Sequence, residues 1–362
     1  MEYKNLSLNS SEKAVFDMRE LFETYGYTQY KVSKFEEYDL YATNKKFLIS
    51  DNILTFTDTT GKLMALKPDV TLSIVKNSKA DKNAIQKVYY CENVYRTQSG
   101  SQGFKEIMQT GLECIGDVDL YSMSEVLMLA AKSLEKISES YILDISHMGF
   151  MSGLLDCGIE PQDQKRILKL IGMKNVPEIV SLCDELAIPE RIKEAVCKMT
   201  TLYLPLEESV EAMKEYVTNR KMASAVSELE AVLNVMKLYG IDKKLYVDLS
   251  MVNDMNYYSG IIFQGFIEGI PDGVLSGGRY DNLLQKIGKN TGAIGFAVYL
   301  DKLEMLIKSG REYDVDTLVV YGDDVSAEAV VNAVLSLTKE GKSSRAVKAV
   351  PEDVKYRELM ML

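Results

Sequence analysis

The chain has little of what metal chemistry, disulfide frameworks and membrane insertion require. Its 362 residues include one histidine, no tryptophan and five cysteines, an odd number without a CxxC pair. Such a set does not provide the ligands of a zinc site, so we expect no metal and free thiols in a reducing, cytoplasmic compartment. No apolar run approaches the ~18 residues of a membrane span, and the first residues lack the apolar core of a secretory signal. We therefore expect no contact with a membrane.

Basic residues are also in deficit, with 42 Lys and Arg against 53 Asp and Glu, for a formal net charge of -11 and a pI of about 4.9. A nucleic-acid binder uses a basic face, because neutralised phosphates provide most of its affinity. The charge therefore disfavours nucleic acid as a partner. The chain is long enough for two or three domains with cores of their own.

The pattern along the chain predicts an α+β fold with three parts. Residues 1–310 mix strand-like and helical segments, and within them about 160–240 is almost purely helical, with breaks at Pro177, Pro189 and Pro205. Acids and bases are interspersed there, which favours a solvated helical surface over a tRNA contact. Residues 311–362 follow a strand, helix, strand pattern typical of a small parallel sheet. We expect a mostly antiparallel sheet flanked by helices, a helical insertion and a short C-terminal α/β unit.

Local signals place the first elements. Asn9 with Glu12 fits a capping pair for a first helix that ends at Gly26, and Ser122 with Glu125 fits a second pair for a helix to about residue 137. Residues 274–284, with paired glycines, are expected to be a strand where the backbone passes close to another group.

The most informative segment, Arg96 to Gly116, places Gln109 and Glu113 on one face of an expected strand. Residues 87–95 and 106–115 are rich in Val, Ile and Tyr and predict a wide hairpin. Side chains four apart on a strand point the same way, so the pair can line a pocket for a small polar ligand. An exposed polar strand face fits the same alternation.

Several further segments, read together with this one, resemble the class II aminoacyl-tRNA synthetases, in their histidine-specific branch. They are LKPDVT at 66–71, the second-motif strand with Arg96, NYYSG at 256–260, GGRYD at 277–281 and TGAIGF at 291–296. The resemblance covers roughly residues 1–310. It implies a histidine-binding set made of Asp69, Thr71, Arg96, Gln109, Glu113, Tyr257, Tyr258 and Tyr280.

Residues for amino-acid activation are missing from the same motifs. The signature arginine that stabilises the activated carboxylate aligns with Asn253, and the third-motif arginine that clamps phosphate aligns with Lys302. Lysine does not replace arginine where a planar fork must bind phosphate with two parallel bonds. The second-motif loop is one residue short and keeps only Lys105 as a base. We therefore expect no catalytic residues and no cofactor.

A synthetase-like body with a retained amino-acid pocket resembles the regulatory subunits of ATP phosphoribosyltransferase. That resemblance implies a non-catalytic protein that serves the first step of histidine biosynthesis and its feedback regulation. Its expected partners are L-histidine, a short-form catalytic subunit and a second copy of this chain, in a hetero-oligomer. The alternative is an active histidyl-tRNA synthetase or a related histidine-activating enzyme. His147, the single histidine, is expected to be structural, and residues 311–362 resemble a partial anticodon-binding domain.

Overall fold

The computed structural model describes residues 10–44, 52–79, 84–97, 103–252, 257–306 and 313–362. The chain divides into two compact units, Met1–Leu306 and Ile307–Leu362. Asn9, Asn253 and most of the second-motif loop lie outside the described residues.

A nine-stranded sheet forms the centre of the first unit, in the order β1-β5-β6-β12-β11-β10-β7-β9-β8. Its neighbours pair antiparallel except for β1 with β5 and β7 with β9. The strands are β1 Thr28–Gln29, β5 Gln86–Thr97, β6 Phe104–Gly116, β7 Tyr141–His147, β8 Tyr203–Pro205, β9 Leu245–Asp248, β10 Ile261–Ile267, β11 Leu275–Arg279 and β12 Gly292–Tyr299. The predicted wide hairpin is β5 with β6, paired from Gln86 with Ile115 to Thr97 with Phe104.

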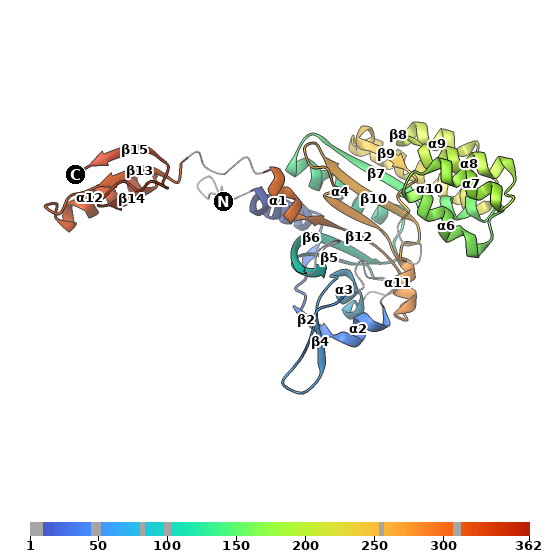
Figure 1. Cartoon of the computed structure of the whole chain (residues 1–362), viewed down its shortest axis with the longest axis horizontal. Helices are drawn as coiled ribbons and strands as arrows, with labels where there is room; N and C mark the ends of the chain where they lie inside the picture. The colour runs from blue at the N-terminus through green and yellow to red at the C-terminus, as the bar shows by residue number, and fades with distance from the viewer. Residues whose placement is uncertain (1–9, 45–51, 80–83, 98–102, 253–256, 307–312) are drawn as a thin grey trace. The chain divides into compact units, whose positions relative to one another are not determined.

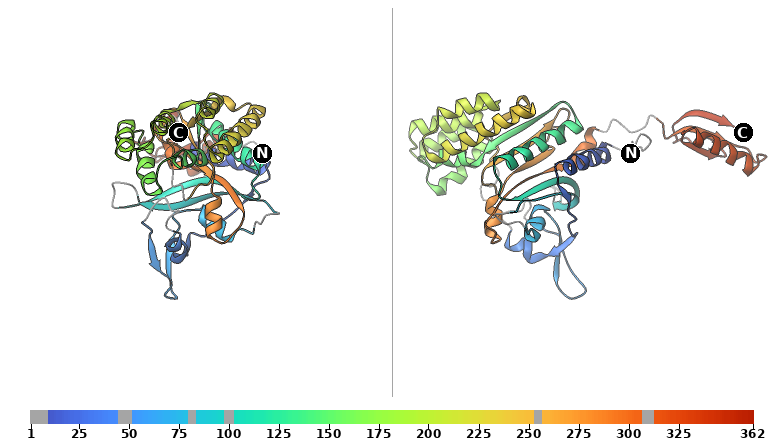
Figure 2. Two further views of the ribbon diagram at one scale, coloured as in Figure 1. Left: turned by 90° about the vertical axis from the view of Figure 1, so that its right-hand side faces the viewer. Right: turned by 180° about the vertical axis from the view of Figure 1, so that it is seen from behind.

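The alternation along β6 separates two sides of this sheet. Leu112 and Cys114 belong to the large core beneath the helices α1 (Ser10–Thr24) and α4 (Leu120–Ile137). These helices lie side by side over that face (Figures 1 and 2). Ile115 belongs to a second core, formed with α3 (Thr71–Asn77) and α11 (Asp281–Lys286). Gln109 and Glu113 therefore project from β6 on the side of these two short helices.

Two local predictions need correction. The N-cap of α4 is Asp119, whose side chain accepts a bond from the backbone N–H of Ser122 at 2.8 Å, and not Ser122 itself. The expected strand at 274–284 ends at Arg279, and α11 follows it, because Asp281 begins a helical turn. After β12, residues Leu300–Leu306 form the 3-10 helix η3.

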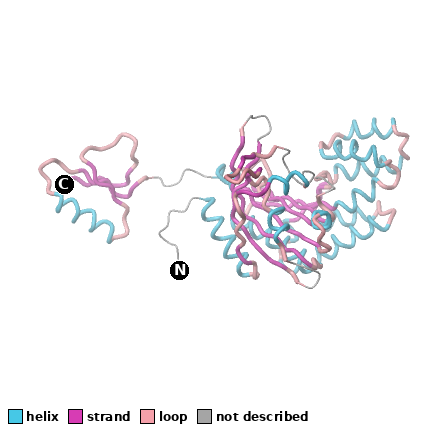
Figure 3. The backbone as a smooth tube through the Cα atoms, turned by 90° about the horizontal axis from the view of Figure 1, so that it is seen from below, coloured by secondary structure: helices cyan, strands magenta, loops and turns pink. Residues whose placement is uncertain are grey.

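The predicted helical insertion contains short helices that start at the prolines. Pro177 lies in the first turn of α7, and Pro189 and Pro205 precede α8 and α9. Proline suits these places because a helix leaves its first N–H groups without internal partners. The helix α5, Met148–Leu155, precedes the insertion. The helices of the insertion are α6 Pro161–Gly172, α7 Val176–Glu185, α8 Glu190–Thr201, α9 Leu206–Lys214 and α10 Arg220–Tyr239 (Figure 3). None of the described helices has both the length and the apolar character to cross a membrane.

A small antiparallel sheet precedes α3. It has the order β2-β4-β3, with β2 Phe35–Glu37, β3 Thr55–Thr57 and β4 Leu63–Leu66. The helix α2, Tyr38–Thr43, follows β2 directly and was not expected from the sequence. β4 leads through Lys67 and Pro68 to Asp69, so this sheet delivers the LKPDVT segment to the second core.

The second unit is a three-stranded parallel sheet with one long helix. Its strands run in the order β14-β13-β15, with β13 Val315–Val320, β14 Ser344–Val347 and β15 Tyr356–Met361. The helix α12, Ala327–Lys339, is capped by the side chain of Ser326 as expected. β15 was missed because its adjacent charged residues, Arg357 and Glu358, interrupt the alternation of a strand.

Candidate functional site

A cavity of about 520 Å³ opens on the sheet face that carries Glu113, and all eight residues of the expected histidine-binding set line it. Asp69 and Thr71 come from the start of α3, and Arg96, Gln109 and Glu113 from the hairpin β5 and β6. The tyrosines come from the segments beside β10 and β11. Four stretches separated by up to about half of the chain thus meet at one place.

Glu113 is the centre of the polar contacts in this cavity. Its Oε1 accepts a bond from the hydroxyl of Thr71 at 2.6 Å, and its Oε2 accepts a short bond from the hydroxyl of Tyr280. Only 2% of Glu113 is exposed, and no cation pairs with it among the described residues. Burial therefore raises the pKa of Glu113 to about 8, although the bonds from Thr71 and Tyr280 lower it.

Asp69 adds a second buried carboxylate. Its Oδ1 accepts a bond from the backbone N–H of Leu72 at 2.8 Å, which caps the first turn of α3. Burial raises the pKa of Asp69 above its usual range, and the guanidinium of Arg96, 3.8 Å away, opposes the shift. Arg96 also donates through Nε to the carbonyl of Pro68 at 2.8 Å, so it holds the segment that carries Asp69.

The side-chain amide of Gln109 has a donor group without a partner among the described residues. Its Nε2 is buried without a hydrogen-bond partner in the part of the chain that the structure describes, and the residue is only 2% exposed. A buried amide without a partner costs about 1–3 kcal/mol, so a ligand acceptor at this place gains that amount. The carboxylates and this amide together suit a small ligand with both cationic and acceptor groups.

Three tyrosine rings form the apolar wall. Tyr257 and Tyr258 meet edge to face with ring centroids 4.6 Å apart, and Tyr257 lies 5.7 Å from Tyr280. Burial raises the pKa of each hydroxyl above its ordinary value, so all three are neutral donors at physiological pH. A planar ring of a ligand would find aromatic contacts on this side and carboxylates on the other.

Further polar residues line the cavity beside the expected set. They are Gln264, Ser276 and Tyr299, which the sequence did not single out, and Lys302. Lys302 donates to the carbonyl of Gly273 at 2.7 Å and lies 5.3 Å from the ring centroid of Tyr299. Its ammonium is thus engaged with the protein. Strand alternation back from Tyr280 along β11 could have indicated Ser276, four positions earlier, but nothing local indicates Gln264 or Tyr299.

The lone histidine has a structural role, as expected. Nδ1 of His147 accepts the backbone N–H of Gly149 at 3.1 Å and caps α5, so Nε2 carries the proton and donates to Glu228 at 3.0 Å. Among the described residues no group of three or more His, Cys, Asp and Glu could hold a metal ion.

Comparisons with known proteins agree with this geometry. The histidyl-tRNA synthetase family model matches residues 6–303. The ATP phosphoribosyltransferase regulatory subunit of Oceanobacillus iheyensis is 32% identical over 319 residues, which are 86% of this chain and 78% of that protein. A solved regulatory subunit/histidyl-tRNA synthetase from Bacillus halodurans C superposes with a TM-score of 0.82 at 23% identity, over 98% of this chain and 96% of that one.

A chain of the ATP phosphoribosyl transferase (HisG:HisZ) complex from Thermotoga maritima has a TM-score of 0.63 at 21% identity, over 79% of this chain and 96% of that one. At such identities the solved structures establish the fold. They confirm the predicted α+β architecture, a class II synthetase-like sheet flanked by helices.

Proposed function

The chain belongs to the family of ATP phosphoribosyltransferase regulatory subunits, which share the histidyl-tRNA synthetase fold, and we propose that it senses L-histidine for a catalytic partner. It is a regulatory subunit and not an active synthetase, as the sequence predicted. The partner in this proposal is a short-form ATP phosphoribosyltransferase, and the regulated reaction is the first step of histidine biosynthesis. The place of action is the cytoplasm.

The observation that carries the ligand is the polar set of the cavity. Two buried carboxylates, Asp69 and Glu113, and the unpaired amide of Gln109 face one space that three tyrosine rings close. An amino acid with an imidazole side chain brings an ammonium group, a carboxylate and a planar ring with polar nitrogens. Each of these groups has a counterpart on the cavity wall. Where water is excluded, an ion pair between opposite charges is strongly favourable, and so is a hydrogen bond to a donor that otherwise has no partner.

The roles divide as follows in this proposal. Asp69 and Thr71 hold the ammonium group, and Arg96 and Gln109 hold the carboxylate. Glu113 accepts from the imidazole while Tyr257, Tyr258 and Tyr280 pack against its ring. Nothing is consumed, because Lys302 is engaged with the carbonyl of Gly273 and does not clamp a phosphate.

Regulation needs a difference in affinity between two states of the assembly. If histidine binds the less active state of the complex more tightly, a coupling free energy of ~1–3 kcal/mol changes activity several-fold or more. The cavity supplies the sensor in this account. We further propose a homodimer of this chain within the hetero-oligomer, and a partial anticodon-binding-like domain in residues 311–362.

Histidine binding and inhibition test the proposal. Calorimetry should detect binding of L-histidine by the wild type, and adding the chain to a short-form catalytic subunit should raise its activity and make it inhibitable by histidine. Gln109→Ala should weaken that inhibition. Gln285→Ala, an exposed glutamine on α11, is the matched control and should not. Absence of histidine binding, alone and with the partner, would refute the sensor.

A further inference from the structure

Residues at the starts of two short helices donate hydrogen bonds to the two oxygens of Glu113. Thr71 is the first residue of α3, which has seven residues, and Tyr280 is the N-cap of α11, which has six. Helices of this length are not stable alone in water, so contacts elsewhere must fix their positions. Whatever ties α3 to α11 therefore also sets the distance between Thr71 and Tyr280 across the cavity.

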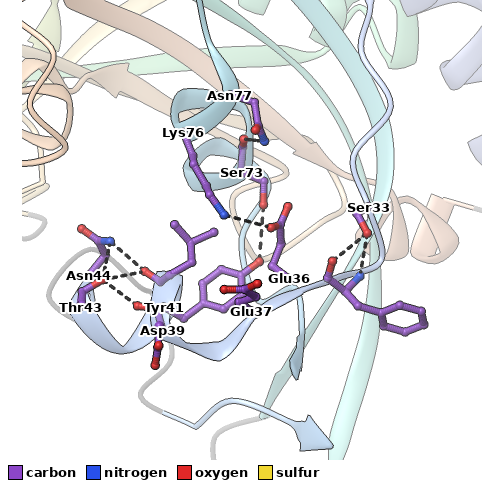
Figure 4. Close-up of polar contacts among 12 residues, drawn as sticks. Ser33, Glu36, Glu37, Asp39, Tyr41, Thr43, Asn44, Ser73, Lys76 and Asn77 are labelled. Atoms are coloured by element: carbon purple, nitrogen blue, oxygen red, sulfur yellow. Dashed lines mark hydrogen bonds and ion pairs between the residues drawn. The ribbon is translucent and has the colours of Figure 1, made fainter. Parts of the chain in front are cut away.

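Figure 4 shows the polar contacts that hold the outer side of α3. The hydroxyl of Tyr41 on α2 lies 3.5 Å from that of Ser73, and Lys76 lies 3.5 Å from Glu36 on β2. The Asn77 side chain donates to the carbonyl of Ser73 at 2.9 Å, within the helix itself. These contacts attach α3 to α2 and the small sheet, whereas α3 meets α11 in the second apolar core.

Lys289 adds direct hydrogen bonds between the end of α11 and the end of α3. Gly288 has φ of +83°, and the backbone N–H groups of Gly288 and Lys289 donate to the carbonyls of Gln285 and Leu284 at 3.1 and 2.8 Å. This Schellman ending closes α11 and directs Lys289 back from it. The ammonium of Lys289 then donates to the carbonyl of Val75 at 2.6 Å and to that of Ser78, with the carbonyl of Lys76 3.5 Å away.

These carbonyls belong to the last turn of α3 and its end, where a helix has acceptors without internal partners and a partial negative charge. A half-buried ammonium with two to three such acceptors is a specific tie between elements 214 residues apart. Lys289 does not line the cavity, so it has no contact with a ligand there.

We propose that Lys289 is a positioning residue of the histidine site. It ties the end of α3 to the end of α11, and thereby fixes Thr71 and Tyr280 at the two oxygens of Glu113. The proposal deepens the proposed function and rests on it for the identity of the ligand. The tie itself is a property of the chain without ligand, so it has a test of its own.

Four variants separate positioning from a general loss of charge. Lys289→Met removes the ammonium and keeps a long apolar stem, and Lys289→Arg keeps a cationic donor. Lys76→Met removes another lysine from the same end of α3, one whose ammonium faces Glu36. Gly288→Ala keeps Lys289 but strains the left-handed turn that directs it, because φ is positive there. No neighbour would touch the added Cβ, so the backbone strain is the only effect.

Two measurements on the full chain are needed, calorimetric affinity for L-histidine and hydrogen exchange of the backbone amides at 72–78 and 283–289. Lys289→Met should weaken the affinity roughly 2- to 30-fold, the range for residues that act on a site without touching its ligand. It should also speed exchange in both helices. Gly288→Ala should do the same more weakly, and Lys289→Arg should recover part of the affinity. Lys76→Met should stay close to the wild type, because Lys76 is solvent-exposed and its long pair with Glu36 contributes little.

Unchanged exchange in Lys289→Met would overturn the proposal, because the tie would then not exist in solution. Faster exchange with unchanged affinity would overturn it as well, since the helices would not control the cavity. An equal loss in Lys76→Met would attribute the effect to charge alone. If the wild type bound no histidine, the sensor proposal would fail, and the exchange data would still decide whether Lys289 ties α3 to α11.

Discussion

The hydroxyl of Thr71 lies 2.6 Å from Oε1 of Glu113, although 42 positions separate the two residues in the sequence. This bond joins the first turn of α3 to strand β6 of the sheet. A buried carboxylate is ordinarily paired with a cation, but here its partner is a neutral hydroxyl. The site is thus built around an acid that holds its proton near neutral pH in the ligand-free protein.

A change of Glu113 to Gln should expose this titration in the stability of the protein. The folded-state pKa of about 8 lies above the ordinary glutamate value of 4.5, so the folded protein binds the extra proton. Its stabilising effect is complete below the unfolded pKa and is lost as the pH rises through about 8. The unfolding free energy of the wild type, relative to Glu113→Gln, should fall by about 1.4 kcal/mol per pH unit between these limits.

Chemical denaturation of both proteins at several pH values between 4 and 9 measures this difference. Other titrating groups are shared by the two proteins, so their contributions cancel. A difference that stays constant with pH would mean that folding does not shift the pKa of Glu113.

Gly295 on β12 should tolerate no side chain, because it lies against Glu113. A Cβ at this position would collide with Oε2 of Glu113 and would stand 2.5 Å from the backbone carbonyl of Leu112, which cannot move within the sheet. Gly295→Ala should therefore lose stability by about 1–3 kcal/mol and weaken histidine binding by displacing the carboxylate. Gly103→Ala, where a Cβ meets nothing within 4 Å, is the control. Equal affinities in the two variants would count against the placement of Glu113 in the ligand site.

The sequence predicted which side chains of β6 share the face that lines the cavity, for a physical reason. Strand side chains alternate between faces, so Gln109 and Glu113 had to share one face once β6 was identified. Arg96 follows from the pairing of β5 with β6. The resemblance to the histidine-specific synthetases then supplied Asp69, Thr71 and the tyrosines, which local patterns could not have joined to them.

What the sequence did not predict depends on competition between local signals or on distant contacts. Asp119 and Ser122 are both good N-caps, and only the packing of α4 decides that Asp119 is used. The apolar residues after Tyr280 fit a strand as well as the short helix α11. The tie from Lys289 to the end of α3 has no local signal at all, because its partners lie 214 residues earlier.

Restoring one arginine should not restore amino-acid activation. Lys302 occupies the place of the third-motif arginine, but it donates to the carbonyl of Gly273, and Asn253 brings no charge to an activated carboxylate. In Lys302→Arg we expect no histidine-dependent exchange of pyrophosphate into ATP, as in the wild type. The double variant with Asn253→Arg is the sharper test, because it returns the missing positive charge as well as the planar guanidinium at position 302. Exchange in the single variant would show that the cavity retains the remaining parts of an adenylation site.

The pair of Lys87 and Glu125 should be a main contributor to the core between the sheet and α4. Nζ of Lys87 lies 2.6 Å from Oε1 of Glu125, whose side chain is 2% exposed, and the hydroxyl of Tyr121 donates to Oε2 at 2.8 Å. Lys87→Met leaves a buried carboxylate without its cation, so we expect a loss of about 3 kcal/mol in the free energy of unfolding. A second change, Glu125→Gln, removes the unpaired buried charge. The double variant should therefore regain part of the lost free energy of unfolding.

Lys214→Met is the matched surface control, because Lys214 is 39% exposed and pairs with exposed Glu211 and Glu230. Such pairs contribute about 0–1 kcal/mol, since water screens them and two long side chains lose freedom. Urea denaturation of the single variants and of Lys87→Met with Glu125→Gln gives the coupling energy directly. The hydroxyl of Tyr27 also donates to Oε1 of Glu125, at 3.3 Å. If Lys87→Met lost no more than Lys214→Met, the hydroxyls of Tyr27 and Tyr121 would be sufficient to hold the Glu125 carboxylate, and the ion pair would be dispensable.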